Sequence, residues 1–129
     1  MALVDQVHRS ELVVEPILTS VARARDMIRR SLKSVDSDWV ERAAVCGSEL
    51  VTNAVCHGSP PIVLTVLDDA DRIIVAVEDG SRQPPMPRIA GIGEQSGRGT
   101  LIVDRMADQW GVDFLPQGKR VWCLIARSQ

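Results

Sequence analysis

The sequence lacks a strong charge of one sign, a long apolar run and a recognisable leader. It carries 15 basic and 17 acidic residues, for a formal net charge of −2. This balance excludes bulk electrostatic attraction to a nucleic-acid backbone as the basis of function. The apolar runs are far shorter than the ~20 residues of a membrane-spanning helix, and the first ten residues contain Asp5 and no apolar stretch typical of a signal peptide. We therefore expect a cytoplasmic protein that contacts neither a membrane nor nucleic acid directly.

The sequence also lacks an organised set of cysteines. Cys46, Cys56 and Cys123 do not have the spacing of a metal site. Cys46 and Cys56 would lie about 15 Å apart along one predicted helix, which is too far for a disulfide. An odd number of cysteines without a pairing pattern is typical of a reducing compartment.

Length and composition predict one folded domain, residues 1–129. The 129 residues are 45% hydrophobic and 25% charged, which is ordinary for a soluble globular protein. A chain of this length buries roughly two thirds of its unfolded surface in a single core. We find no internal repeat and no second domain in the pattern.

A first helix is predicted over residues 17–33. Apolar residues, including Leu18 and Ile28, recur there near helical spacing. The opposite side is basic, and it is either a solvated face or a partner-binding surface. Its members are Arg23, Arg25, Arg29, Arg30 and Lys33.

A second helix is predicted up to residue 57. Asp36 or Ser37 can cap its start, and an apolar stripe runs along it to Asn53. Gly58 is the type of residue that usually follows a helix end, and the prolines at 60–61 prevent continuation.

The remaining chain reads mostly as short β-branched strands separated by turns. A loop rich in proline and glycine interrupts them over residues 80–99, and a loop of this length is usually functional. The element order predicts an α+β fold, a two-layer sandwich with helices on one face of a mostly antiparallel sheet. The predicted strands are 11–15, 62–67, 73–77, 109–115 and 119–126, with a third helix over 100–108.

An acid and an amide share one face of the second helix. Glu49 and Asn53 lie four residues apart, and positions i and i+4 of a helix point the same way. Either both side chains face water, or both face a polar ligand, because buried polar groups must be paired.

Two further segments contain candidate ligand-binding groups. Asp79 follows an apolar strand, where it is either part of an Asp-Gly turn or an acceptor for a ligand. A glycine-rich run opens the third predicted helix, where free N–H groups favour phosphate. It is not a dinucleotide fingerprint, because no strand directly precedes it and Ile102 stands where the third glycine belongs. The run consists of Gly97, Arg98, Gly99, Thr100 and Leu101.

Taken together, these segments resemble in order and spacing the Bergerat-fold (GHKL) ATPases, the superfamily of gyrase B and the histidine kinases. The resemblance covers nearly the whole chain. The phrases ELVTNAVCHG and GRGTLIVDRMADQWGV are most similar to the bacterial anti-sigma factor serine/threonine kinases, a branch of that superfamily.

The resemblance implies ATP and Mg²⁺ as cofactors and a role for each segment. Asn53 would hold the Mg²⁺, which prefers oxygen ligands, and Glu49 would be the catalytic base towards a serine hydroxyl or a water. Asp79 would accept a hydrogen bond from the adenine amino group. The loop over residues 80–96 would be a lid, and His57 would be structural. The phosphates would be cradled by Gly97, Arg98 and Gly99 with the N–H groups of Thr100 and Leu101.

The chain departs from the family pattern in two places. The family's D-x-G-x-G segment reads Asp79-Gly80-Ser81-Arg82-Gln83 here, and a late-strand threonine is replaced by the run Gly118–Trp122, which contains a bulky arginine. Both departures concern the adenine end of the site and leave the phosphate end intact.

The resemblance also implies partners. They are a sigma factor, an anti-sigma factor antagonist of the STAS type that carries the substrate serine, and a second copy in a homodimer. Phosphorylation of the antagonist would release the kinase to sequester the sigma factor. The alternative is a non-catalytic interaction scaffold with a degenerate nucleotide site. The altered adenine segment favours this alternative, and the retained Glu49 and Asn53 argue against it.

Overall fold

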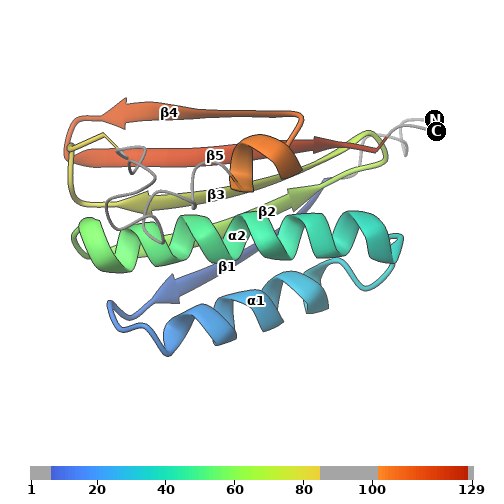
Figure 1. Ribbon diagram of the computed structural model, residues 1–129, viewed down its shortest axis with the longest axis horizontal. Helices are drawn as coiled ribbons and strands as arrows, with labels where there is room; N and C mark the ends of the chain where they lie inside the picture. Colours follow the sequence, from blue (N-terminus) through green and yellow to red (C-terminus); the bar gives the residue numbers. More distant parts are fainter. Residues whose placement is uncertain (1–6, 85–101, 128–129) are drawn as a thin grey trace.

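Within residues 7–84 and 102–127, which the computed structural model describes, five strands form one sheet and two helices cover one of its faces (Figure 1). The strand order is β1-β2-β3-β5-β4, and every neighbouring pair is antiparallel. The predicted α+β class with helices on one face is confirmed. The elements are β1 (His8–Val14), α1 (Ser20–Ser31), α2 (Ser37–His57), β2 (Ile62–Asp68), β3 (Arg72–Asp79), β4 (Gln109–Leu115) and β5 (Gly118–Ala126).

The central strands form because their apolar residues alternate in the period of a sheet. In β2 the buried positions Ile62, Leu64 and Val66 alternate with half-buried ones, so one face points to the helices. A turn then reverses the chain into β3. The Asp69 carboxylate accepts hydrogen bonds from the N–H groups of Asp71, at 2.8 Å, and Arg72, at 3.0 Å, as aspartate commonly does in turns.

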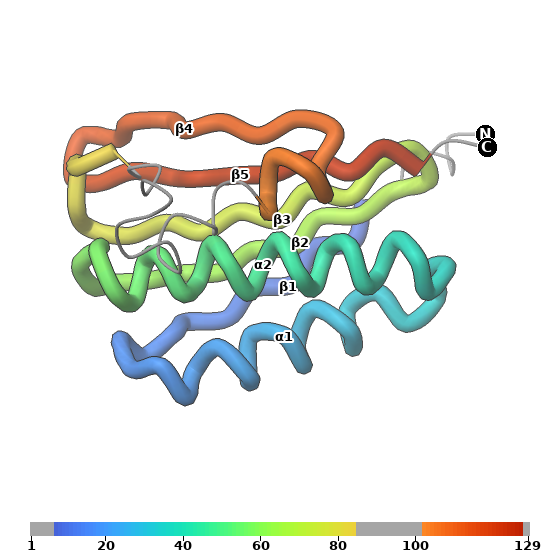
Figure 2. The backbone as a smooth tube through the Cα atoms, viewed as in Figure 1, coloured from blue at the N-terminus to red at the C-terminus, as the bar shows by residue number. Residues whose placement is uncertain are grey.

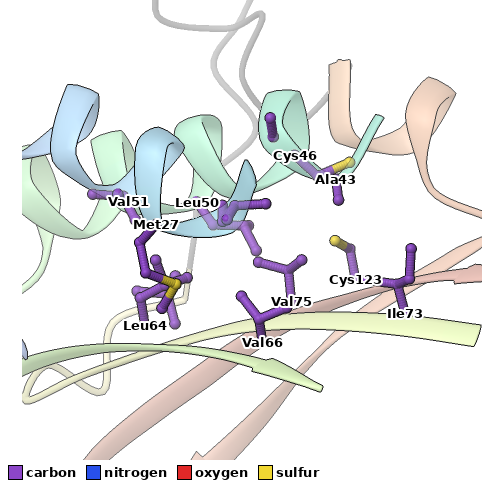
Figure 3. Close-up of a cluster of buried hydrophobic side chains, with 14 of the residues drawn as sticks. Met27, Ala43, Cys46, Leu50, Val51, Leu64, Val66, Ile73, Val75 and Cys123 are labelled. Carbon is purple, nitrogen blue, oxygen red and sulfur yellow. The ribbon is translucent and has the colours of Figure 1, made fainter. Parts of the chain in front are cut away.

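Helix α2 is the element on which the core is built. Figure 2 shows it running along the middle of the sheet, with α1 beside it over β1. Gly47 permits the close packing of the two helices, because a Cβ at this position would collide with the end of the Ile28 side chain. The core between α2 and the sheet is tightly packed, and in Figure 3 it includes Leu50, Leu64 and Val75.

Two cysteines that are far apart in the sequence meet in this core. Cys46 of α2 and Cys123 of β5 are fully buried and close together (Figure 3). A hydrogen bond with Cys46, together with burial, raises the pKa of the Cys123 thiol well above its usual value. Cys56, by contrast, is exposed near the end of α2.

Several basic side chains of α1 form ion pairs or hydrogen bonds within the protein. Arg29 donates to Glu41 of α2 at 3.0 and 3.1 Å, and Arg30 pairs with Asp26 one turn away at 3.0 Å. Arg25 donates to the Ser48 hydroxyl at 3.1 Å. The hydrogen bond from Arg29 lowers the pKa of Glu41. Part of this face therefore ties the two helices together.

The first strand and first helix differ from their predicted bounds. β1 spans residues 8–14, and α1 begins only at Ser20, so Leu18 lies outside the helix and is 61% exposed. Residues 17–20 form a turn instead, in which the Ser20 N–H donates to the Ile17 carbonyl at 3.0 Å. The apolar stripe of α1 starts at Val21, which is partly buried against the core, and Leu18 only matches its spacing.

Both ends of α2 lie where they were predicted, but the capping differs. Asp36 is the N-cap residue, yet its side chain makes no capping hydrogen bond. Gly58 has φ −95° and ψ −163°, so extended backbone, and not a left-handed turn, ends the helix. The glycine is required for another reason, because a Cβ there would lie 2.6 Å from the Asp79 carboxyl carbon.

The later strands are close to prediction, and Gly118 belongs to β5 instead of the preceding turn. β2 and β3 are slightly longer than expected, and β4 spans residues 109–115 as predicted. Before β4, residues 102–106 are helical and bury Val103 in the core. In the part of the chain that the structure describes, no helix has the length and apolarity needed to cross a membrane.

Candidate functional site

Glu49 and Asn53 lie on one flank of α2. Both are half-buried, and they alternate with the fully buried Leu50, Val51 and Ala54, which face the sheet. The two polar side chains therefore lie at the border between the core and the surface. A side chain at this border can meet a ligand without the full cost of burying a polar group.

Arg42 shows what this flank of α2 faces. It precedes Glu49 by seven residues, so it lies on the same side of the helix. Its guanidinium donates to the Met106 carbonyl oxygen from Nε, at 2.8 Å, and from Nη2, at 2.6 Å. Its Nη2 also lies 3.6 Å from an Asp108 carboxylate oxygen. We call Arg42, Glu49 and Asn53 the α2 flank, and it faces the segment that leads into β4.

Asp79 is the last residue of β3, and its side chain is buried. Its Oδ1 accepts hydrogen bonds from the N–H groups of Ser81, at 2.7 Å, and Ser59, at 3.4 Å. Gly58, at the end of α2, packs against the carboxylate. The end of α2 and the end of β3 are therefore in direct contact.

Lys119 also contacts Asp79, and sequence reasoning missed it. The two residues are paired across β3 and β5, and Lys119 Nζ lies 3.0 Å from Oδ2 and 3.2 Å from Oδ1 of Asp79. The alternation of side chains along the strand could have indicated this contact. Lys119 alternates with Arg120, which points to the other face of the sheet and pairs with Glu78 at 3.0 Å.

These contacts set an order along α2. Asp79 lies at Gly58, Asn53 is five residues earlier, and Glu49 is nine residues earlier. At 1.5 Å per residue, these separations are about 7 Å and about 13 Å along the helix axis. Along the helix axis, the three candidate residues therefore follow one another from the end of the helix towards its middle.

Five predicted site residues lie outside the described residues, namely Gly97, Arg98, Gly99, Thr100 and Leu101. The same holds for residues 85–96 of the predicted lid. His57 is the exposed last residue of α2.

The residues present fit a magnesium-bound triphosphate beside Asn53, towards the middle of α2. Asn53 offers an amide oxygen, a ligand type that Mg²⁺ accepts, and Mg²⁺ usually needs only one or two protein ligands beside phosphates and waters. Among residues 7–84 and 102–127, no three His, Cys, Asp or Glu side chains gather as a separate metal site. At the end of α2, Asp79 already has a charged partner within the chain, so this end does not fit a carboxylate left open for a base.

Comparison with known proteins agrees with this fold. Residues 14–124 match the histidine kinase-like ATPase domain family. An uncharacterized protein of Streptomyces coelicolor is 33% identical over an alignment of 81 residues, and the match covers 59% of this chain and 77% of that protein.

A solved structure is similar over almost the whole chain. It is the crystal structure of the RsbU and RsbW domains of Rv1364c from Mycobacterium tuberculosis, with a TM-score of 0.70 and 14% identity. The similarity covers 94% of this chain but only 33% of that one, so this chain spans about a third of that protein's length. At this identity the likeness establishes the fold alone.

Family match and fold agree with the resemblance read from the motifs. The match includes α2 with Glu49 and Asn53, and β3 with Asp79. It confirms the resemblance to the GHKL superfamily, and an ATPase domain implies ATP as the ligand. The chain belongs to the histidine kinase-like ATPase domain family.

Proposed function

We propose that this chain binds Mg-ATP at the α2 flank and transfers the γ-phosphoryl group to a serine of a small antagonist protein. In the same proposal it holds a sigma factor, as a homodimer, when the antagonist is phosphorylated. One observation carries it: Glu49 and Asn53 share a half-buried flank of α2, which Arg42 ties to the segment following the glycine-rich run.

Each residue has a role that its chemistry suits. The bound magnesium would neutralise charge on the phosphates during transfer, and Asn53 would hold that ion through its amide oxygen. Glu49 would accept the proton of the serine hydroxyl. A bond then forms between the serine oxygen and phosphorus, and the bond from phosphorus to the ADP oxygen breaks. The order along α2 supports this assignment, because along the helix axis Glu49 lies farther than Asn53 from Gly58, which contacts Asp79.

The proposed partners rest on the motif resemblance and on the likeness of the fold. The sequence phrases resemble those of anti-sigma factor kinases, and the fold is similar to a structure that contains an RsbW domain. Both support an anti-sigma regulator whose substrate is an anti-sigma factor antagonist. Affinity capture with the full chain, with and without ATP, tests this proposal. We expect the antagonist and the sigma factor to be recovered under different nucleotide conditions.

Nucleotide binding is tested by thermal unfolding with and without Mg-ATP. A ligand at 100 times its dissociation constant adds about 2.7 kcal/mol to the free energy of unfolding, which raises the midpoint by several degrees in a domain of this size. Asn53→Ala should remove the magnesium-dependent part of this shift. An unchanged midpoint at millimolar Mg-ATP would count against the proposal.

Phosphoryl transfer is tested separately from binding. Glu49→Gln should keep the thermal shift but lose transfer to the antagonist, since the amide cannot accept the hydroxyl proton. Glu41→Gln is the matched control, because Glu41 is an exposed glutamate of the same helix that pairs with Arg29. Transfer that survives Glu49→Gln would show that another group is the base.

A second candidate function is an interaction scaffold without phosphoryl transfer. The ion pair between Lys119 and Asp79 favours it, because this pair occupies the carboxylate expected to read the base. The scaffold should still capture a partner but show no nucleotide-dependent shift. The two candidates therefore differ in the thermal unfolding experiment itself.

A further inference from the structure

Lys119 and Asp79 form a buried pair at the position where Asp79 was expected to accept a hydrogen bond from the adenine amino group. The Lys119 and Asp79 side chains are only 6% and 3% exposed. Besides its contacts with both carboxylate oxygens, Lys119 Nζ donates to the Ser81 carbonyl oxygen at 3.3 Å. The ammonium group thus has three oxygen atoms of the chain within 3.3 Å.

The rest of the carboxylate is also enclosed by the chain. Oδ1 accepts the N–H groups of Ser81 and Ser59 in addition to Lys119. Oδ2 lies 3.0 Å from Lys119 Nζ and packs against Gly58, where a Cβ would lie 2.7 Å away. Asp79 is therefore held by its own fold on several sides.

This arrangement changes what Asp79 can offer to a nucleotide. A hydrogen bond to an unpaired, charged carboxylate is about twice as strong as one between neutral groups. A carboxylate neutralised by a lysine loses that advantage. Adenine presents an amino donor and guanine a carbonyl acceptor at the same ring position, and the pair, already bonded within the chain, offers neither a free charged acceptor nor a free donor. It has little basis for preferring either base.

We propose that Lys119 is a specificity-determining residue of the nucleotide site. Because it pairs with Asp79, the protein recognises a nucleotide through its triphosphate and not through its base. The inference rests on the proposed function, because it concerns the same nucleotide site. It accounts for a chain that keeps Glu49 and Asn53 while its adenine segment departs from the family pattern. The nucleotides it takes are purine triphosphates as a class.

The test is calorimetric binding of Mg-ATP and Mg-GTP to the full chain and to Lys119→Thr, which replaces the ammonium with a short neutral group. The wild-type protein should bind the two nucleotides within about threefold of each other, and the variant should shift the ratio towards ATP by about tenfold. A wild-type preference for ATP above about thirtyfold, or a ratio that Lys119→Thr leaves unchanged, overturns the inference.

A second variant controls for folding, because Lys119→Thr leaves a buried carboxylate without its partner. Asp79→Asn combined with Lys119→Met keeps both shapes and removes both charges. Its ATP-to-GTP ratio should stay near that of the wild type, since it has no charged acceptor. A gain of ATP preference in this double variant overturns the charge argument.

Inorganic tripolyphosphate with Mg²⁺ separates this inference from the proposed function. Tripolyphosphate should compete with both nucleotides in the wild-type protein, because the triphosphate carries the affinity. If neither nucleotide nor tripolyphosphate binds any variant, the proposed function fails and the inference fails with it. If ATP binds with strong base preference, only the inference fails.

Discussion

Removing Lys119 should destabilise the fold far more than removing a comparable surface cation. Lys119→Met keeps the unbranched side chain except for its terminal ammonium group but leaves the Asp79 carboxylate, 3% exposed, with two backbone N–H donors at 2.7 and 3.4 Å. Breaking a buried ion pair by deleting one partner costs about 3–5 kcal/mol. In a domain of this size, that loss lowers the thermal midpoint by about 10–20 °C.

The neighbouring residue provides the control. Arg120 follows Lys119 in β5 but pairs on the other face of the sheet, where Arg120 and Glu78 are 39% and 42% exposed. Exposed pairs contribute about 0–1 kcal/mol, so Arg120→Met should change the free energy of unfolding only slightly. The measurement is urea unfolding of both variants, followed by circular dichroism at neutral pH.

The double variant Asp79→Asn/Lys119→Met decides the physical cause. If the cost of Lys119→Met comes from an unpaired buried charge, removing that charge should restore most of the lost stability. Equal effects of Lys119→Met and Arg120→Met would refute the reasoning, because they would show that the pair is not effectively buried. A double variant as unstable as the single one would instead point to lost packing.

Three further predictions concern other parts of the fold. Gly58→Ala should lower the free energy of unfolding by about 1–3 kcal/mol, measured by urea unfolding, because its Cβ would lie 2.6 Å from the Asp79 carboxyl carbon. A thiol reagent should label only Cys56 in the folded protein and all three cysteines after unfolding, as mass spectrometry would show; labelling of a buried cysteine at the same rate would contradict the packing. Burial raises the pKa of Asp68 in the folded protein, so the folded protein holds this proton more tightly than the unfolded chain does. The contribution of Asp68 to stability therefore falls as pH rises from the unfolded pKa to the raised folded pKa. Asp68→Asn should therefore flatten that fall in unfolding curves recorded from acidic to neutral pH, and an unchanged slope would argue against it.

Part of the geometry of the candidate site could be predicted because its signals are local. Glu49 and Asn53 share a flank of α2 through simple helical spacing, and the C-terminal end of that helix follows from Gly58 and the prolines after it. Leu18 was misplaced because it matched the helical period without belonging to the helix. Periodicity indicates which residues could share a face but not where a turn ends and a helix begins.

The sequence by itself determined the succession of strands and helices along the chain, and it indicated the family. Apolar periods, turn residues and motif spacing are properties of neighbouring positions. Only the tertiary structure decided which groups meet. Lys119 and Asp79 are 40 residues apart, and Arg42 and Met106 are 64 apart. Their contacts depend on the register between β3 and β5 and on the packing of α2 against the segment before β4. A shift of one residue in strand register moves every side chain to the other face of the sheet. The register between β3 and β5 therefore decides that Lys119, and not Arg120, meets the Asp79 carboxylate.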